Sequence, residues 1–116
     1  MILRDIRGRR CLAGVLALAV LALAQQARAA DAAAGRSKAG ATCKTCHGVD
    51  GIGRMPNVPH IAGESDIYLI TQLKAFREGT RTHEIMSIIA KDLSDTDIEN
   101  LAAWYSGIEI SVTVPE

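Results

Sequence analysis

The stretch Cys43-Lys44-Thr45-Cys46-His47 decides how the rest of this sequence is interpreted. Two cysteines stand three positions apart, and a histidine follows the second one directly. This is the pattern at which haem is attached covalently to a protein. Each thiol can add to one of the two vinyl groups of the haem, and the imidazole of His47 then lies where it can bind the iron. The pattern therefore predicts one covalently bound haem c.

Two other uses of these residues are open at this point. A Cys-x-x-Cys pair also occurs in thioredoxin-like redox proteins, where it lies beside a βαβ unit, but no strong strand pattern precedes Cys43. Cys43, Cys46 and two of the three histidines also have the ligand types of a Cys₂His₂ zinc site. A zinc-binding structural module is therefore an alternative, which an absorption spectrum would distinguish from a haem protein.

Residues 1–29 have the three parts of a secretory signal peptide in the usual order. A basic start precedes an apolar run of 14 residues, Cys11 to Ala24, and the small-x-small site Ala27-Arg28-Ala29 follows. The run is shorter than the roughly 20 residues that a membrane-spanning helix needs. We therefore expect residues 1–29 to be cleaved and a domain of residues 30–116 to remain in the periplasm, without stable insertion in a membrane.

The region after the signal is small and mildly acidic. Its 87 residues carry 8 Lys or Arg and 12 Asp or Glu, a net charge of −4, which argues against nucleic acid as a partner. Its two cysteines are too close in sequence to stabilise a fold by a disulfide. A core in so small a domain rarely supplies more than roughly 3–5 kcal/mol, and a buried haem would fill the volume that the four aromatic side chains leave.

The pattern of residues 30–116 predicts an all-α fold in which helices are joined by loops. An alanine-rich helix from Asp31 to about Lys44 leads into the cysteine motif. Four glycines and two prolines between Gly48 and Gly63 predict a loop. The stretch from Ile110 to Val114 favours β structure but is short and terminal, so we expect a tail.

Two further helices are predicted after the loop. The first has Ser65 as its N-cap, ends at Gly79, and carries three apolar residues at three-residue spacing, Ile67, Ile70 and Leu73. Residues 81–93 predict a loop, with a short helix as an alternative. The last helix follows the capping-box-like Ser94-Asp95-Thr96-Asp97 and ends at Gly107. Its apolar face comprises Ile98, Leu101, Ala102 and Tyr105.

Several short motifs follow one another in an order typical of one family. They are Gly35 eight residues before Cys43, Cys43-x-x-Cys46-His47-Gly48, Pro59-His60-Ile61-Ala62-Gly63, Phe76-Arg77-x-Gly79-x-Arg81, Met86-Ser87-x-Ile89-Ala90-Lys91 and Leu101-Ala102-Ala103-Trp104-Tyr105. In this order they resemble a class I c-type cytochrome, a single-domain relative of the soluble dihaem bacterial cytochromes. The resemblance covers nearly all of residues 30–116. It implies a small cytochrome c fold, three to five helices packed around one covalently bound haem.

The resemblance implies a role for each matching residue. Cys43 and Cys46 would form the two thioethers, and His47 would be the proximal iron ligand. The backbone carbonyl of Pro59 would accept a hydrogen bond from the other ring nitrogen of His47, which fixes the orientation of the imidazole. Met86 would bind the iron from the distal side through its thioether sulfur.

The distal position has other candidates besides Met86. Met55 lies eight residues after His47, in the loop expected to support His47 from its own side, whereas Met86 lies 39 residues after His47 and beyond a whole helix. Met86 can therefore approach the opposite haem face. His83 and His60 are the remaining candidate ligands, and His60 departs from the family pattern. A methionine among isoleucines is otherwise core filler.

The resemblance also implies a close helix contact at Gly35. Glycine has no side chain to obstruct a neighbouring backbone. We therefore expect the last helix to cross the first one at Gly35, near Trp104 or Tyr105.

Histidine–methionine ligation implies a relatively high reduction potential and leaves no open position for a substrate. We therefore expect a periplasmic electron carrier, monomeric and not an enzyme. It would shuttle single electrons between a donor dehydrogenase or membrane oxidoreductase and a terminal oxidase or reductase. The alternative is a haem-bearing electron-transfer subunit of a periplasmic dehydrogenase or of a peroxidase-like enzyme, which would need a persistent interface or a displaceable distal ligand.

Overall fold

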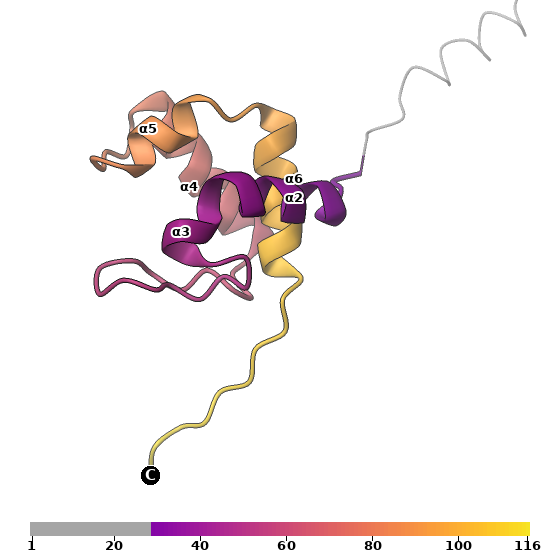
Figure 1. Ribbon diagram of the computed structural model, residues 1–116, viewed down its shortest axis with the longest axis vertical. Coiled ribbons are helices and arrows are strands. Elements are labelled where there is room, and N and C mark those ends of the chain that lie inside the picture. Colours follow the sequence, from indigo (N-terminus) through magenta and orange to yellow (C-terminus); the bar gives the residue numbers. More distant parts are fainter. Residues whose placement is uncertain (1–28) are drawn as a thin grey trace, which may run out of the picture.

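The computed structural model describes residues 29–116, in which helices alternate with loops (Figure 1). The elements are α2 (Ala32–Lys38), the π-helix η1 (Ala39–Cys43), α3 (Lys44–His47), α4 (Asp66–Glu78), α5 (Met86–Lys91) and α6 (Asp95–Ser106). No strand occurs among these described residues, and the all-α prediction is confirmed. The signal peptide predicted for residues 1–29 lies outside the described part of the chain, apart from Ala29.

The first helical stretch is longer than the sequence predicts, because α2, η1 and α3 follow one another without a break up to His47. Asp31 caps its start by accepting hydrogen bonds from the backbone N–H groups of Ala33 and Ala34, at 2.8 and 3.1 Å. The π-helical turn in its middle is a rare conformation that is common at functional sites. Gly48 ends the stretch with a φ of 72°, which favours glycine.

Helix α4 begins and ends where the sequence predicts, and two residues of its predicted apolar face, Ile70 and Leu73, pack against the core. Ser65 Oγ accepts a hydrogen bond from the backbone N–H of Tyr68 at 3.2 Å, and Gly79 ends the helix in the left-handed region. Leu69 and Phe76 are the residues of α4 that are buried in the core. Ile67 is 74% exposed, so its expected place on the apolar face is wrong. The face follows the helical period through Leu69, Leu73 and Phe76.

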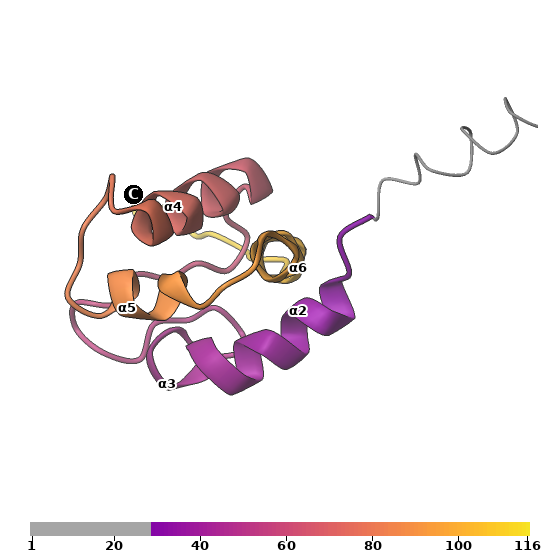
Figure 2. The same ribbon diagram turned by 90° about the horizontal axis from the view of Figure 1, so that it is seen from above.

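Helix α6 is the central element of the core. Its predicted capping box is present, because the Ser94 Oγ accepts from the Asp97 N–H while the Asp97 carboxylate accepts from the Ser94 N–H. All four residues of its predicted apolar face are buried: Ile98, Leu101, Ala102 and Tyr105. Figure 2 shows α6 end-on, with α2 on one side and α4 on the other.

The contact between α2 and α6 depends on Gly35, as expected. A Cβ atom at this position would overlap the backbone oxygen of Asn100, and it would lie 2.5 Å from the Asn100 carbonyl carbon and 3.0 Å from the Trp104 Cβ. The missing side chain of Gly35 therefore lets the two helices cross at backbone contact.

Helix α5 is the short helix that the sequence left as an alternative, and it packs on α4. It reaches the core through Ala90, which is fully buried. Beyond α6 the chain runs away from the helices as an extended tail (Figure 1). Within residues 29–116, no helix is both long enough and apolar enough to cross a membrane.

Candidate haem-binding site

Cys43, Cys46 and His47 lie at the end of the first helical stretch, where η1 meets α3. Both cysteines are half-buried and have free thiols, and Cys43 packs against the hydrophobic core. Residues three positions apart lie on one face of a helix, so the two thiols can reach one flat molecule. Burial raises the pKa of the Cys43 thiol.

The imidazole of His47 is oriented by the loop that follows it. Its Nδ1 atom lies 3.0 Å from the backbone oxygen of Pro59. Because a carbonyl oxygen can only accept, Nδ1 must carry the proton and donate it. The Nε2 atom then keeps its lone pair and is free to bind a metal ion. This is the contact that the sequence predicted for Pro59.

The loop between Gly48 and Gly63 is closed by backbone hydrogen bonds. The carbonyl of Gly51 accepts from the N–H groups of Ile61 and Ala62, at 2.8 and 3.1 Å. A Cβ atom on Gly51, whose φ is 74°, would lie 2.6 Å from the Ala62 nitrogen. The loop thus folds back on itself, which brings Pro59 to His47.

Two aromatic side chains of α6 hold the beginning of this loop. The Tyr105 hydroxyl donates to the carbonyl of Gly48 at 3.0 Å, and the Trp104 indole N–H donates to the carbonyl of Val49 at 2.8 Å. A phenol is protonated at neutral pH and can donate, and burial raises the pKa of Tyr105 further. Sequence reasoning missed these two contacts. The signal for them was the adjacent placement of two of the four aromatic residues near the end of the last helix.

Met86 and Met55 differ in their surroundings. Met86 is the first residue of α5 and is half-buried against the hydrophobic core, where Cys43 also packs. Met55 lies in the loop after His47 and is 49% exposed. Of the two thioethers, Met86 is therefore the one that packs against the same hydrophobic core as Cys43.

The two other histidines make local hydrogen bonds instead of gathering at the cysteines. His60 Nδ1 accepts from the backbone N–H of Gly53 at 2.8 Å, within the loop. His83 Nδ1 accepts from the N–H groups of Ile85 and Met86, at 3.2 and 3.3 Å. Within residues 29–116, no three His, Cys, Asp or Glu side chains are grouped so that they could hold a metal ion.

The residues of the site fit haem. The structure provides two half-buried thiols on one helix face, an imidazole with a free Nε2 atom, and a thioether on a separate helix. Large apolar side chains also stay exposed in the segments that carry the candidate ligands, namely Ile52, Ile85 and Ile88. Exposed apolar side chains of this kind suit the faces of a porphyrin.

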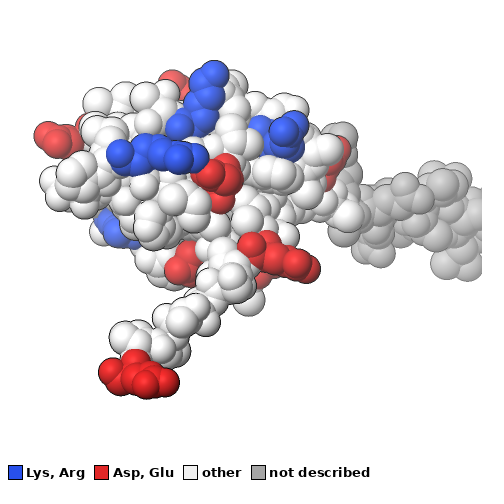
Figure 3. Space-filling view, turned by 60° about the horizontal axis from the view of Figure 1, so that its bottom comes forward, with Lys and Arg blue, Asp and Glu red and all other residues white. Residues whose placement is uncertain are grey.

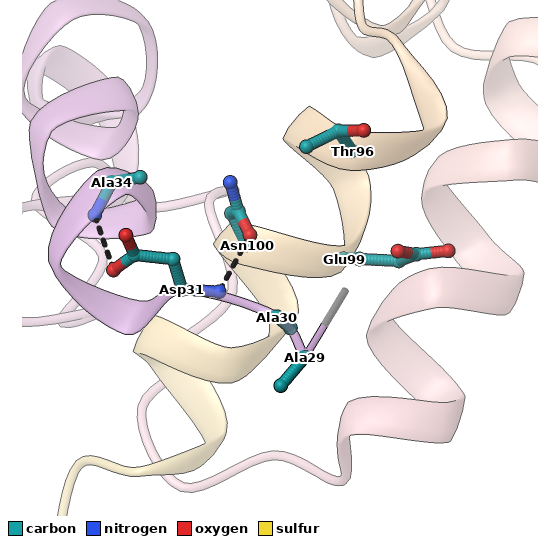
Figure 4. Close-up of a pocket in the computed structure, with 7 residues that line it drawn as sticks. All are labelled: Ala29, Ala30, Asp31, Ala34, Thr96, Glu99 and Asn100. Atoms are coloured by element: carbon teal, nitrogen blue, oxygen red, sulfur yellow. Dashed lines mark hydrogen bonds between the residues drawn. The ribbon is translucent and has the colours of Figure 1, made fainter. Parts of the chain in front are cut away.

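A shallow pocket lies elsewhere, between the start of α2 and helix α6 (Figure 4). Asp31 and Asn100 lie in its wall and are joined by a hydrogen bond of 2.7 Å from the Asp31 N–H to the Asn100 side-chain oxygen. Since Asp31 begins the helical stretch that Cys43 and Cys46 end, this pocket is at the opposite end from the cysteine motif.

Comparison with known proteins agrees with this site. The model of the family described as cytochrome c matches residues 32–107. Cytochrome c-554(548) of Halomonas halodenitrificans is 46% identical over 78 residues, which cover 65% of this chain and 93% of that protein. Cytochrome c4 of Pseudomonas aeruginosa is 41% identical over 78 residues, which cover 67% of this chain but 38% of that protein.

One solved structure and one further relative extend the comparison. The crystal structure of reduced recombinant cytochrome c4 from Pseudomonas stutzeri is similar with a TM-score of 0.65 and 39% identity, over 72% of this chain and 48% of that one. A thiosulfate dehydrogenase electron acceptor of Thiomonas intermedia is 39% identical, over 61% of this chain and 33% of that protein. The chain thus spans nearly all of the Halomonas protein but less than half of the others.

Proposed function

Because the chain belongs to the cytochrome c family, whose members carry covalently attached haem c and transfer electrons, we propose that it is a periplasmic electron carrier. In this proposal Cys43 and Cys46 form the thioethers, and His47 and Met86 are the axial ligands. Residues 1–29 are the cleaved signal peptide, and residues 30–116 form the working domain. The bound haem supplies the exchange of single electrons between ferrous and ferric iron.

The contact between His47 and Pro59 is the observation that carries this proposal. The 3.0 Å contact between the His47 Nδ1 atom and the Pro59 oxygen leaves Nε2 as the metal-binding atom and fixes the plane of the ring. Met86, half-buried on α5, supplies a sulfur from a different part of the chain.

If His47 and Met86 hold the iron, side chains would fill both of its remaining ligand positions, and none would be left for a substrate. Ligands that stay bound in both oxidation states would leave little rearrangement to accompany electron transfer. These properties suit a carrier and do not suit a catalyst that must bind a substrate at the metal.

The partners in this proposal are redox proteins. The relative from Thiomonas is named as the electron acceptor of thiosulfate dehydrogenase, so a dehydrogenase is the class of donor that we propose, with a terminal oxidase or reductase as acceptor. On the face shown in Figure 3, basic and acidic side chains are interspersed. Such a surface suits brief encounters of a monomer with several partners.

The second candidate is a haem-bearing subunit of a periplasmic dehydrogenase. The observation that favours it is the similarity to a relative that is named as a thiosulfate dehydrogenase electron acceptor. Purification of the native protein distinguishes the two candidates, because a carrier elutes alone and a subunit elutes with its enzyme.

The ligand set is tested by the near-infrared absorption of the ferric protein. A sulfur-to-iron charge-transfer band is expected in the wild type, and it should disappear in Met86→Ala. The matched variant Met55→Ala, in the exposed loop, should keep the band. Loss of the band in Met55→Ala and its retention in Met86→Ala would contradict the proposed ligation.

A further inference from the structure

His83 forms hydrogen bonds to the start of α5 through both its ring and its backbone. Its Nδ1 atom accepts from the N–H groups of Ile85 at 3.2 Å and of Met86 at 3.3 Å. Its own N–H donates to the Ser87 hydroxyl at 2.9 Å, and its carbonyl accepts from the Ser87 N–H at 3.0 Å. His83 and Ser87 therefore bracket the turn that contains Met86.

The ring of His83 is also held from the side. It meets the ring of Phe76 on α4 in an edge-to-face arrangement, with 6.5 Å between centroids and 72° between planes. Phe76 belongs to the hydrophobic core. Such a contact fixes the direction in which Nδ1 points, so the beginning of α5 is tied to α4 through one side chain.

Helix α5 needs this support because it lacks an ordinary cap. Ile85, the residue before its first turn, makes no side-chain hydrogen bond to the helix. The first N–H groups of any helix have no partner within the helix. Here the N–H of Met86 is one of these groups, and the His83 Nδ1 atom takes the place of the usual cap oxygen.

We infer that His83 is a positioning residue that holds the backbone of Met86 so that its thioether sulfur stays on the haem iron. This inference rests on the proposed function, in which Met86 is the distal ligand. His83 itself does not bind the iron. With the His83 cap in place, the first turn of α5 opens less often. The Met86 sulfur therefore spends less time away from the iron.

Two substitutions separate the acceptor atom of His83 from its ring. His83→Phe keeps an aromatic ring against Phe76 but removes the acceptor. His83→Asn loses the ring but keeps a side-chain oxygen at the distance of Nδ1, as an N-cap asparagine does. Both are made in the full haem-loaded protein, with Met86→Ala as the variant that reports loss of the ligand.

Two measurements follow Met86 without relying on electron-transfer activity. The first is the rate at which cyanide binds to the ferric protein, since the sulfur must leave before cyanide enters. The second is the hydrogen exchange of the Met86 amide, followed by NMR. In His83→Phe we expect both rates to rise by about threefold to tenfold, the effect of losing one helix cap. In His83→Asn both rates should stay within about twofold of the wild type.

Two other outcomes would contradict the inference. Wild-type rates in His83→Phe would show that the acceptor does not hold Met86. Equal acceleration in both variants would assign the effect to the ring contact with Phe76 and would overturn the inference as well. Failure of the proposed ligation is distinguishable, because the wild type would then lack the near-infrared sulfur band or Met86→Ala would keep it, whatever the His83 variants do.

Discussion

The two regions that support the candidate axial ligands His47 and Met86 are held in different ways. The proximal loop, residues 48–63, is fastened by residues far away in the sequence, through the Tyr105 hydroxyl and the Trp104 indole. The distal segment, residues 81–93, is held at Met86 by the neighbouring His83, at 3.3 Å from its Nδ1 atom to the Met86 nitrogen. Side chains distant in the sequence thus fasten the proximal loop, whereas the start of the distal segment is fastened by a neighbouring residue, and the rest of α5 packs on α4.

This difference predicts where the protein opens. Segments with few long-range contacts open locally at a lower free energy than the core does. In the proposed ligation, the thioether of Met86 is also a weaker ligand than an imidazole, and the thioether links of Cys43 and Cys46 would hold the haem to the His47 side. We therefore expect the backbone amides of the distal segment to exchange with solvent first. The proximal loop should stay in place until the whole domain unfolds.

The largest effect is expected from removing the covalent links on the proximal side. Wild-type protein exported to the periplasm should keep its haem through acid–acetone extraction, because thioethers survive this treatment. Cys43→Ala and Cys46→Ala can form at most one link each and should yield far less holoprotein. Haem staining after denaturing electrophoresis measures this. Haem that is extracted from the wild type would contradict the proposed attachment.

The next largest effect is expected at the crossing of α2 and α6, which supports the proximal side. Gly35→Ala places a methyl group against the Asn100 backbone and should lower the free energy of unfolding by about 3 kcal/mol. Gly40→Ala is the matched control, because nothing lies within 4 Å of the added carbon. Chemical denaturation measures both. Equal stability of the two variants would show that the crossing is not tight.

A smaller effect is expected from the hydrogen bond that fastens the proximal loop to α6. Tyr105→Phe removes the donor to Gly48 and should lower the free energy of unfolding by about 1 kcal/mol. Tyr68→Phe, at an exposed tyrosine, should change it little. If the two sides are held independently, Tyr105→Phe leaves the rate of cyanide binding unchanged. Faster cyanide binding in this variant would remove the distinction between the two regions.

The smallest effect is expected from acid titration at the start of α6, which follows the distal segment. Hydrogen bonds from Ser94 hold the pKa of Asp97 below its ordinary value, and Arg77 does the same for the pKa of Asp95. A carboxyl group whose pKa is lowered by folding stabilises the folded state at pH values above its ordinary pKa of about 3.8. This stabilisation is lost as the pH falls through the lowered pKa. Thermal unfolding of Asp97→Asn should therefore depend less on pH in this range than that of the wild type or of Asp92→Asn.

Much of the fold follows from local signals in the sequence. The caps at Ser65 and Ser94, the stop at Gly79 and the buried face of α6 were predictable because each depends on a few neighbouring residues. The exposure of Ile67 was not, since three-residue spacing drifts around a helix and the packing partner decides which stripe is buried.

The candidate site also has some contacts that the sequence predicts and others that it does not. The cysteine motif and the Pro59 contact were predictable from the motif and the family resemblance. The hydrogen bonds of Trp104 and Tyr105 to the proximal loop join residues 55 and 57 positions apart, so the adjacent aromatic pair signals a contact but does not identify its partner. The role of His83 as a cap escaped because histidine is not a usual capping residue. Its position four residues before Ser87 was the available signal.

Carbon monoxide binding to the ferrous protein tests the central claim most directly, since it reports whether the distal position is filled. If Met86 binds the iron, the wild type should bind carbon monoxide slowly and incompletely, and the ferric form should be low-spin at neutral pH. Met86→Ala should bind carbon monoxide rapidly, whereas Met55→Ala should behave like the wild type. Rapid binding by the intact wild type, together with a high-spin ferric spectrum, would contradict the carrier and favour an enzyme with an open haem site.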